Sequence, residues 1–286
     1  MAVRAKAVLR LRQLVYSGWL GWQMEANWAH PTEFLTYALV RPICHVLILV
    51  FIYLAVRSGN SQQGQFYGMF VGNAFFVFVN AIMLGTGQII HEDREHFRVL
   101  KYIYCSPLSI FSYLSGRTAT KIILTGISTV VMLIFGRFVL GIPISLFTIN
   151  YPLLLLVFIL GVLGTLALGI MVAGFFLVTA RHAGVLSGGI AGLFNLASGT
   201  LFPITTLPKW LQSVSRAIPI TYWIEATRRA VLGASYFDGL QHLGTGELVA
   251  ILFGTTAATM VVGVLFYRAM EKIALTRGYL ERITHY

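Results

Sequence analysis

The chain has 286 residues, of which 57% are hydrophobic and only 11% are charged. A soluble globular protein carries about 25% charged residues, so this composition excludes an ordinary soluble domain. The formal net charge of +11 would suggest a nucleic-acid partner in a soluble protein. Here it is better explained by basic residues at the cytoplasmic ends of membrane spans, and we expect no nucleic-acid partner. The two cysteines, Cys44 and Cys105, form neither a metal-binding pattern nor a disulfide framework.

Residues 1–32 predict an amphipathic helix that lies in the membrane interface. One face of this helix carries apolar residues at spacings of three and four, namely Val8, Leu11, Val15, Trp19 and Trp22. Tryptophan with flanking arginine is typical of helices at a membrane surface. The basic residues near the N-terminus are also typical of a mitochondrial presequence. Of these two interpretations we favour the interfacial helix.

Six apolar blocks follow, and each is long enough to cross a bilayer, which takes about 20 helical residues. Lipid offers no partner to a free backbone N–H or C=O group, so such blocks must be helices or barrel strands. Barrel strands alternate polar and apolar residues, whereas these blocks are apolar on every face. We therefore expect an all-α membrane protein with one transmembrane domain over residues 1–286. The expected transmembrane helices cover residues 34–56, 66–90, 118–140, 153–178, 183–202 and 248–267.

The distribution of Lys and Arg predicts the orientation of these spans. If the N-terminus is cytoplasmic, most of the basic residues fall on the cytoplasmic side, in agreement with the positive-inside bias. An even number of spans then returns the C-terminus to the same side. We expect a multi-pass protein of the cell's inner membrane with both termini in the cytoplasm.

The sequence contains no P-loop, no His-Glu-x-x-His motif and no Gly-x-Ser-x-Gly motif. Acidic residues in apolar surroundings are few, whereas a membrane-embedded proton relay or metal site needs more of them. We therefore expect no catalytic residue, no metal site and no cofactor bound by this chain itself.

The polar segment 91–108 begins directly at the end of the second apolar block. Its apolar residues recur at helical spacing: Phe97, Leu100, Ile103 and Tyr104. These positions predict a short amphipathic helix along the membrane surface, which Pro107 ends. Such a helix would present charged side chains to the cytoplasm, namely Glu92, Arg94, Glu95 and Arg98. An ordinary solvated loop is the alternative.

This segment resembles the coupling segment of ABC-2 type permeases, the membrane subunits of ATP-driven exporters. The residues that carry the resemblance are Glu92, Arg94, Glu95, Leu100, Ser106 and Pro107. The resemblance implies that the segment, including Asp93 and Arg98, couples the spans to an ATPase. Many members of the family carry Gly-Thr after the charged cluster, where this chain has Phe97 and Arg98.

Residues 203–232 are similar to the external re-entrant hairpin of the same family. The matching stretches are Leu201-Phe-Pro203, Leu207-Pro-Lys-Trp-Leu211 and Ile218-Pro-Ile-Thr-Tyr222. The resemblance implies an outer gate, and the gate residues would be Pro203, Pro208, Trp210, Pro219, Tyr222, Glu225 and Arg229.

The residues themselves also favour two short helices in this hairpin. Pro208 suits the first turn of a helix, and Pro219 separates that helix from a second one. Each helix is too short to span the membrane. Glu225 and Arg229 lie four residues apart, so we expect them to form an ion pair. An amphipathic external loop with no gating role is the alternative.

Three asparagines are candidates for the translocation path or for packing: Asn73, Asn80 and Asn195. Asn73 and Asn80 are seven residues apart and share a helical face, where a buried amide needs a partner. Interhelical hydrogen bonding is the favoured role over contact with substrate. Gly184, Gly188 and Gly192 have the small-x-x-x-small spacing that allows helices to approach closely.

The resemblance implies a permease subunit that forms the path for an amphipathic substrate such as a drug, lipid or glycolipid. It also implies two copies of an ATPase partner, which would bind ATP and Mg²⁺, and a second permease copy or a homologue. Export of a polysaccharide or lipid-linked glycan is the first alternative. A polytopic membrane enzyme that uses Glu92, Asp93 and His96 is the second, and a channel or proton-coupled carrier is the third.

Overall fold

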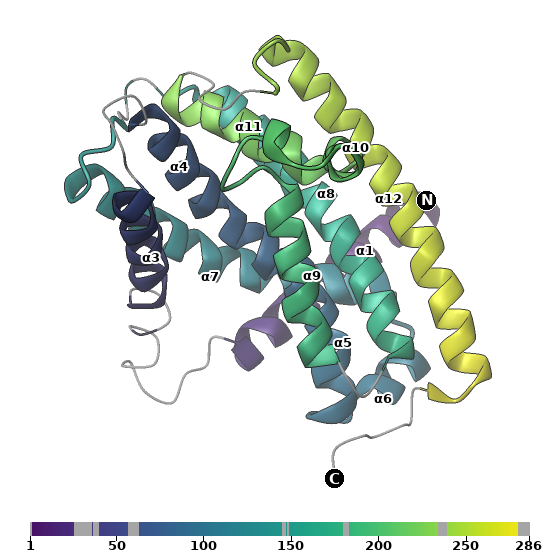
Figure 1. Cartoon of the computed structure of the whole chain (residues 1–286). Coiled ribbons are helices and arrows are strands. Elements are labelled where there is room, and N and C mark those ends of the chain that lie inside the picture. The colour runs from purple at the N-terminus through teal and green to yellow at the C-terminus, as the bar shows by residue number, and fades with distance from the viewer. Residues whose placement is uncertain are drawn as a thin grey trace.

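The computed structural model describes residues 2–25, 36, 40–56, 63–144, 147, 149–179, 183–233 and 239–279 (Figure 1). Residues 26–32 of the predicted interfacial helix and most of residues 34–39 of the first predicted span lie outside the described residues. The helical elements are α1 (Ala2–Glu25), α3 (Arg41–Val56), α4 (Gln63–Val79), η3 (Asn80–Leu84), α5 (Gly85–Glu95), α6 (Leu100–Cys105), α7 (Ile110–Phe138), α8 (Tyr151–Val178), α9 (Ala183–Ala197), η4 (Ile204–Thr206), α10 (Lys209–Ala217), α11 (Pro219–Leu232) and α12 (Thr245–Thr276).

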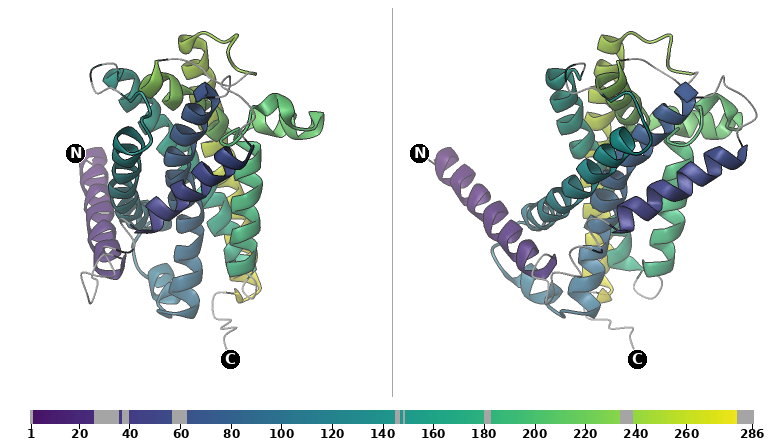
Figure 2. Two further views of the ribbon diagram at one scale, coloured as in Figure 1. Left: turned by 60° about the vertical axis from the view of Figure 1, so that its left-hand side comes forward. Right: turned by 90° about the vertical axis from the view of Figure 1, so that its left-hand side faces the viewer.

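Helix α8 lies at the centre of the bundle and packs against α5, α11, α12 and η3. The charged turn with α6 lies at one end of the bundle, called here the α6 end, and the hairpin α10–α11 lies at the other, called the α10 end (Figure 2). Helix α1 packs along α7 on the outside of the bundle (Figure 2). The main apolar core fills the space between α4, η3, α8 and α11, and a smaller cluster lies at the α6 end.

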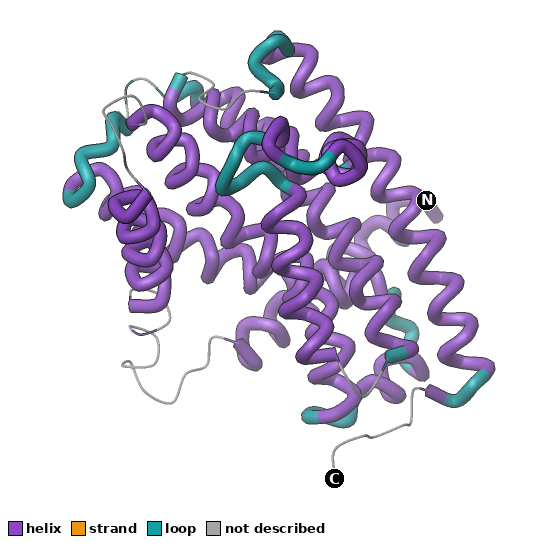
Figure 3. Tube along the Cα trace, in the orientation of Figure 1, coloured by secondary structure: helices purple, strands orange, loops and turns teal. Residues whose placement is uncertain are grey.

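The described residues contain helices and loops and no strand, which confirms the all-α prediction (Figure 3). Four helical segments are long and apolar enough to cross a membrane: Gly64–Glu95, Ile110–Phe138, Tyr151–Val178 and Thr245–Thr276. They correspond to the predicted second, third, fourth and sixth spans.

The predicted first and fifth spans are shorter as described. Helix α3 has 16 residues, and the apolar part of α9 covers Leu186–Ala197, whereas a perpendicular crossing takes about 20 residues. Helix α9 ends at Ala197 rather than at residue 202, because the chain turns there at Gly199, which has a φ of +65°. The six-span arrangement therefore stays a prediction.

Several helices extend beyond the predicted spans, whose boundaries in the membrane stay a prediction. The second apolar helix continues through η3 and α5 to Glu95 instead of ending at residue 90, and α7 begins at Ile110 instead of residue 118. Both helices extend because the polar residues near their ends pair with each other across the bundle, for example Asp93 with Arg117 at 2.5 Å. The length of an apolar block does not show that the helix continues through polar residues that are paired with another helix.

Small residues bring α1 against α7. A Cβ atom built on Gly116 would lie 2.6 Å from Cβ of Ser17, and the Thr120 hydroxyl donates to the Gly18 carbonyl oxygen at 3.1 Å. Val15 and Trp19, from the predicted apolar face, are exposed on the opposite side of α1. Within the chain, therefore, the small face of α1 is its packing face and the aromatic face remains uncovered.

The positions of helix ends follow from local chemistry. The Asn150 side chain accepts from the Leu153 backbone N–H at 3.1 Å and begins α8. Pro219 occupies the first turn of α11, where no N–H is needed. Gly233 ends that helix in the left-handed region, with a φ of +74°.

Substitution of Gly161 by Ala tests the packing of α8 against α11. A Cβ atom at residue 161 would lie 2.0 Å from the Trp223 ring, and Trp223 is fully buried. We expect a loss of about 1–3 kcal/mol of stability from overpacking, measured as a lower midpoint of thermal unfolding in detergent. Gly254→Ala on α12 is the matched control, because nothing lies within 4 Å of its Cβ position. Equal midpoints for the two variants would contradict this packing.

Candidate functional site

A buried ion network joins α1, α5 and α7 at the α6 end. Asp93 accepts from Arg117 at 2.5 Å and from the Tyr113 hydroxyl at 2.8 Å. Arg117 also faces Glu92 at 3.6 Å and Glu25 at 3.8 Å. The side chains of Asp93 and Arg117 are almost completely buried. Arg117 also donates to the Tyr113 hydroxyl at 3.2 Å, whereas its Nε and Nη2 have no hydrogen-bond partner among the described residues.

Two of the four side chains predicted to face the cytoplasm, Arg94 and Glu95, are buried, as is the neighbouring Asp93. Arg94 donates to the carbonyl oxygens of Phe176 and Leu177 at 3.1 and 3.2 Å and contacts the Glu95 carboxylate at 3.2 Å. The prediction of exposure is therefore wrong for Arg94 and Glu95. The reason lies in α8, which ends at Val178 and leaves the carbonyls of its last turn without intrahelical partners. Arg94 supplies both hydrogen bonds and a positive charge at that negative helix end.

The exposed surface of the segment lies beyond this cluster. Arg98 turns the chain, with a φ of +55°, and Leu100 is the buried first residue of α6. The Ser106 hydroxyl donates to the Ile103 carbonyl oxygen at 2.7 Å, and the Pro107 carbonyl oxygen accepts from the Gln13 side chain at 3.2 Å. The side chains that face outward from the turn and from α6 are His96, Phe97, Arg98, Lys101, Tyr102 and Cys105.

Helix α6 is anchored to the far side of the bundle by a pair of tyrosines. The hydroxyls of Tyr104 and Tyr267 lie 2.8 Å apart, which connects α6 to α12. Burial raises the pKa of the Tyr104 hydroxyl, so this group stays protonated as a donor or acceptor at neutral pH. Helical spacing places Tyr104 on the apolar face of the segment, but it reveals neither the partner of Tyr104 nor the roles of Tyr113 and Arg117.

The hairpin at the α10 end consists of two short helices, as predicted. The Tyr222 hydroxyl donates to the Arg216 carbonyl oxygen at 2.8 Å and holds α11 to α10. Trp210 on α10 is 69% exposed, Pro208 precedes that helix, and Pro203 precedes η4. The amphipathic helix α10 therefore leaves its tryptophan uncovered.

The predicted ion pair between Glu225 and Arg229 is confirmed at 3.3 Å. Arg228, which the sequence analysis did not select, makes more contacts. It donates to the carbonyl oxygens of Gly68, Gly199 and Thr200 at 2.8, 3.0 and 2.7 Å. Arg228 thus joins α4, the turn after α9 and α11. The only indication of this role in the sequence is that Arg228 is a charged residue next to the predicted ion pair.

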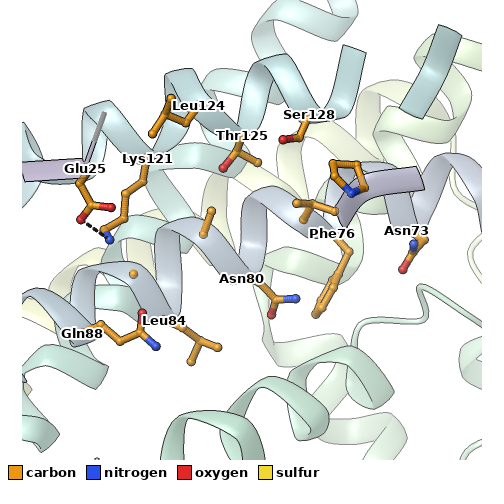
Figure 4. A pocket seen from close by; sticks show the side chains of 14 residues that line it. Glu25, Asn73, Phe76, Asn80, Leu84, Gln88, Lys121, Leu124, Thr125 and Ser128 are labelled. Carbon is orange, nitrogen blue, oxygen red and sulfur yellow. Dashed lines mark ion pairs between the residues drawn. The ribbon is translucent and has the colours of Figure 1, made fainter. Parts of the chain in front are cut away.

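A pocket of about 270 Å³ lies between α4–η3–α5 and α7 (Figure 4). We call it the α4–α7 pocket. It brings together Asn73 and Asn80 but not Asn195, which is on α9. The other polar residues of its wall are Gln88, Thr125, Ser128 and the pair Glu25–Lys121, whose charged atoms lie 2.5 Å apart. The π-helical turn η3 contributes Asn80, and π-turns within α-helices are frequent at functional sites.

The residues required by the membrane-enzyme alternative are not arranged as an acid–base or metal site. Asp93 is engaged by Arg117 and Tyr113, while His96 is exposed on the turn after α5 and stacks edge-on against Phe97. Among the described residues, no group of three or more His, Cys, Asp and Glu side chains could hold a metal ion.

Replacing Asp93 by Asn tests the buried network. The change leaves the Arg117 guanidinium without its closest carboxylate, and breaking a buried pair typically costs about 3–5 kcal/mol. We expect a large drop in the thermal midpoint of the detergent-solubilised protein. Arg98→Gln is the control, because it removes a charge from the same segment at an exposed position. Similar midpoints for Asp93→Asn and Arg98→Gln would show that the network contributes little.

Comparison with known proteins gives one result that covers most of the chain. No curated protein matches the sequence. The model of the ABC-2 type transporter family matches residues 16–232, a range that contains the buried ion network from Glu25 to Lys121, the α4–α7 pocket and the α10–α11 hairpin. The chain therefore belongs to the ABC-2 type transporter family.

Proposed function

We propose that this chain is the permease subunit of an ATP-driven exporter and that segment 96–108 receives force from a separate ATPase. The observation that supports this most directly is the combination of an exposed turn with a buried anchor. Phe97, Arg98, Lys101 and Tyr102 form an uncovered surface. Directly behind it, Arg94 holds the end of α8, and Asp93 holds α7. Displacement of the turn would therefore be transmitted to three helices.

The proposed exporter contains partner subunits in addition to this chain. Two ATPase subunits would bind ATP and Mg²⁺, because the sequence has no P-loop. A second permease copy, or a homologue, would complete the path across the membrane. The cargo would be an amphipathic molecule such as a drug, lipid or glycolipid. Export of a polysaccharide or lipid-linked glycan would use the same energy source with a wider path.

The arrangement in the membrane is also part of the proposal. The α6 end would face the cytoplasm of a cell with this protein in its inner membrane, with both termini on that side. Helices α3 and α9 would complete six spans. The uncovered aromatic face of α1 would contact lipid at the interface. Segment 203–232 would dip into the outer leaflet as a re-entrant gate.

Tyr102 provides a test of ATPase docking. Its side chain is 65% exposed on α6, so Tyr102→Ala should leave folding intact while it weakens the complex with the ATPase. We expect about a tenfold loss of co-purified ATPase, as is typical for an aromatic residue central to an interface. Substrate-stimulated ATP hydrolysis should fall in parallel.

Tyr151→Ala is the matched control for this docking test, because Tyr151 is 54% exposed at the start of α8, away from α6. The docking proposal would be abandoned if both variants retained the ATPase equally. It would also fail if accessible-cysteine labelling of Cys105 placed this end outside the cell.

Trp210 provides a test of the gate. Because its ring is mostly exposed within the chain, Trp210→Ala should change stability by less than about 0.5 kcal/mol, as is usual for surface substitutions. We expect normal assembly of the permease but reduced ATP-driven export in proteoliposomes. Trp223→Ala is the contrasting variant, because Trp223 is fully buried and its loss should impair folding. Poor assembly of Trp210→Ala would instead make Trp210 a packing residue.

A further inference from the structure

Helix α10 lies across the direction of the long apolar helices. Figure 1 shows α10 nearly end-on, whereas α9 and α12 are seen from the side. In both views of Figure 2, α10 projects sideways from the α10 end of the bundle. A helix that lies transverse to membrane-spanning helices, at one end of their bundle, runs along the bilayer surface rather than through the hydrocarbon core.

The inward side of α10 is fixed by contacts with its neighbours. Ser215 is fully buried, and the Gln212 side chain donates to the Leu207 carbonyl oxygen at 2.7 Å. The Tyr222 hydroxyl on α11 donates to the Arg216 carbonyl oxygen at 2.8 Å. These contacts set the rotation of α10 about its own axis, and so they determine which side chains point away from the bundle.

The outward side of α10 carries two adjoining stripes of side chains. Lys209, Ser213 and Arg216 recur at spacings of four and three, and all three are exposed. We call them the basic stripe. Trp210 and Val214, the apolar stripe, occupy the next positions around the helix and are 69% and 47% exposed. A basic stripe beside an aromatic and apolar stripe is typical of helices that lie in a membrane interface.

The charge of the basic stripe is not neutralised by its surroundings. Helix α10 contains two basic residues and no acidic one. Within the part of the chain that the structure describes, neither Lys209 nor Arg216 has an ion-pair partner. Glu225, on the adjoining helix α11, is already paired with Arg228 and Arg229. The surface therefore complements a partner that carries both negative charge and apolar groups.

An anionic phospholipid combines these two properties in one molecule and is present wherever a transverse helix meets the bilayer. Lys209 and Arg216 are seven residues apart, or about 10 Å along the helix, so each can reach a separate headgroup. Their aliphatic stems can lie along apolar groups while the charged ends remain among the headgroups. Tryptophan also favours this depth of the membrane, with its ring in the apolar layer and its N–H near water.

We propose that the outward side of α10 binds anionic phospholipids of the leaflet at the α10 end. Lys209 and Arg216 contact the negatively charged headgroups, and Trp210 and Val214 lie among the upper parts of the acyl chains. The bound lipids hold α10 at the bilayer surface, while the Tyr222 contact ties it to α11. Because this binding requires only that α10 meet the lipid surface, it does not depend on the proposed export function.

Binding is tested on the full chain in phosphatidylcholine nanodiscs without an ATPase. The probes are photoreactive phosphatidylglycerol and photoreactive phosphatidylcholine with the same acyl chains, and mass spectrometry quantifies the cross-links within residues 209–217. We expect phosphatidylglycerol to label α10 at a lower mole fraction than phosphatidylcholine does. Raising the salt concentration from about 0.01 M to about 1 M, which shortens the Debye length from about 30 Å to about 3 Å, should remove this preference.

The variants Lys209→Gln and Arg216→Gln should each weaken labelling by phosphatidylglycerol about fivefold, which corresponds to about 1 kcal/mol for one basic residue near an anionic surface. Arg216→Lys keeps the charge and should keep the labelling. Trp210→Ala should weaken labelling by both probes, because the apolar stripe contacts the acyl chains of either lipid. These side chains are exposed, so the thermal midpoints of all four variants should match that of the wild type.

Lys101→Gln is the matched control, because it removes an exposed basic residue from the α6 end and should leave the labelling of α10 unchanged. The proposal is overturned if both probes label α10 equally in the wild type, or if the glutamine variants on α10 keep the preference for phosphatidylglycerol. It is also overturned if neither probe labels α10, since water or another protein surface would then cover this side. Normal lipid labelling without ATP-driven export would reject the export function and leave the lipid site in place.

Discussion

Buried arginines that donate to main-chain carbonyl oxygens hold both ends of this bundle together. At the α6 end, Arg94 donates hydrogen bonds to carbonyl oxygens in the last turn of α8. At the α10 end, Arg228 donates to carbonyl oxygens of α4 and of the turn after α9. In surroundings of low dielectric constant, neither the guanidinium nor the carbonyl can be left without a partner. Each arginine therefore fixes the relative position of helices that are distant in sequence. The apolar side chains between Arg94 and Arg228 pack with less directional preference, so their packing adjusts to the helix positions that the two arginines set.

The same constraint explains how the charged segment after α5 and the hairpin differ. At the α6 end, acids and bases from three helices neutralise one another, so the segment is rigid behind an exposed turn. At the α10 end, Arg229 donates to the carbonyl oxygens of Leu240 and Leu243, at 2.7 Å each, besides contacting Glu225. The hairpin is therefore held through α11, while α10 is joined to it by the Tyr222 contact and remains largely exposed. Mechanical coupling between the two faces of a membrane would need this arrangement, with a rigid segment at one end of the bundle and a largely exposed hairpin helix at the other.

Much of the fold could be predicted from the sequence because apolar length is a one-dimensional property. Residues 151–178 form a helix that contains the predicted fourth span, and Pro219 separates α10 from α11 as predicted. The extension of the helices to Glu95 and from Ile110 could not be predicted, because it depends on the contact between Asp93 and Arg117 across two helices. The burial of Arg94 could not be predicted either, because no residue near it in the sequence shows that the end of α8 lies beside it. Asn73 and Asn80 were placed on one face by their spacing, but only the tertiary structure shows that both line a pocket and that Asn73 Nδ2 and Asn80 Oδ1 have no hydrogen-bond partner among the described residues.

The close fit of Arg228 against α4 has a consequence for motion. A Cβ atom on Gly72 would lie 2.4 Å from Nη2 of Arg228, so the guanidinium occupies the notch that this glycine leaves. Because the same group also holds the carbonyl oxygens of Gly199 and Thr200, sliding of α4 along its axis would carry the turn after α9 with it or extract a charged group from three acceptors at once. Helix α4, α11 and the turn after α9 should therefore move together as one unit.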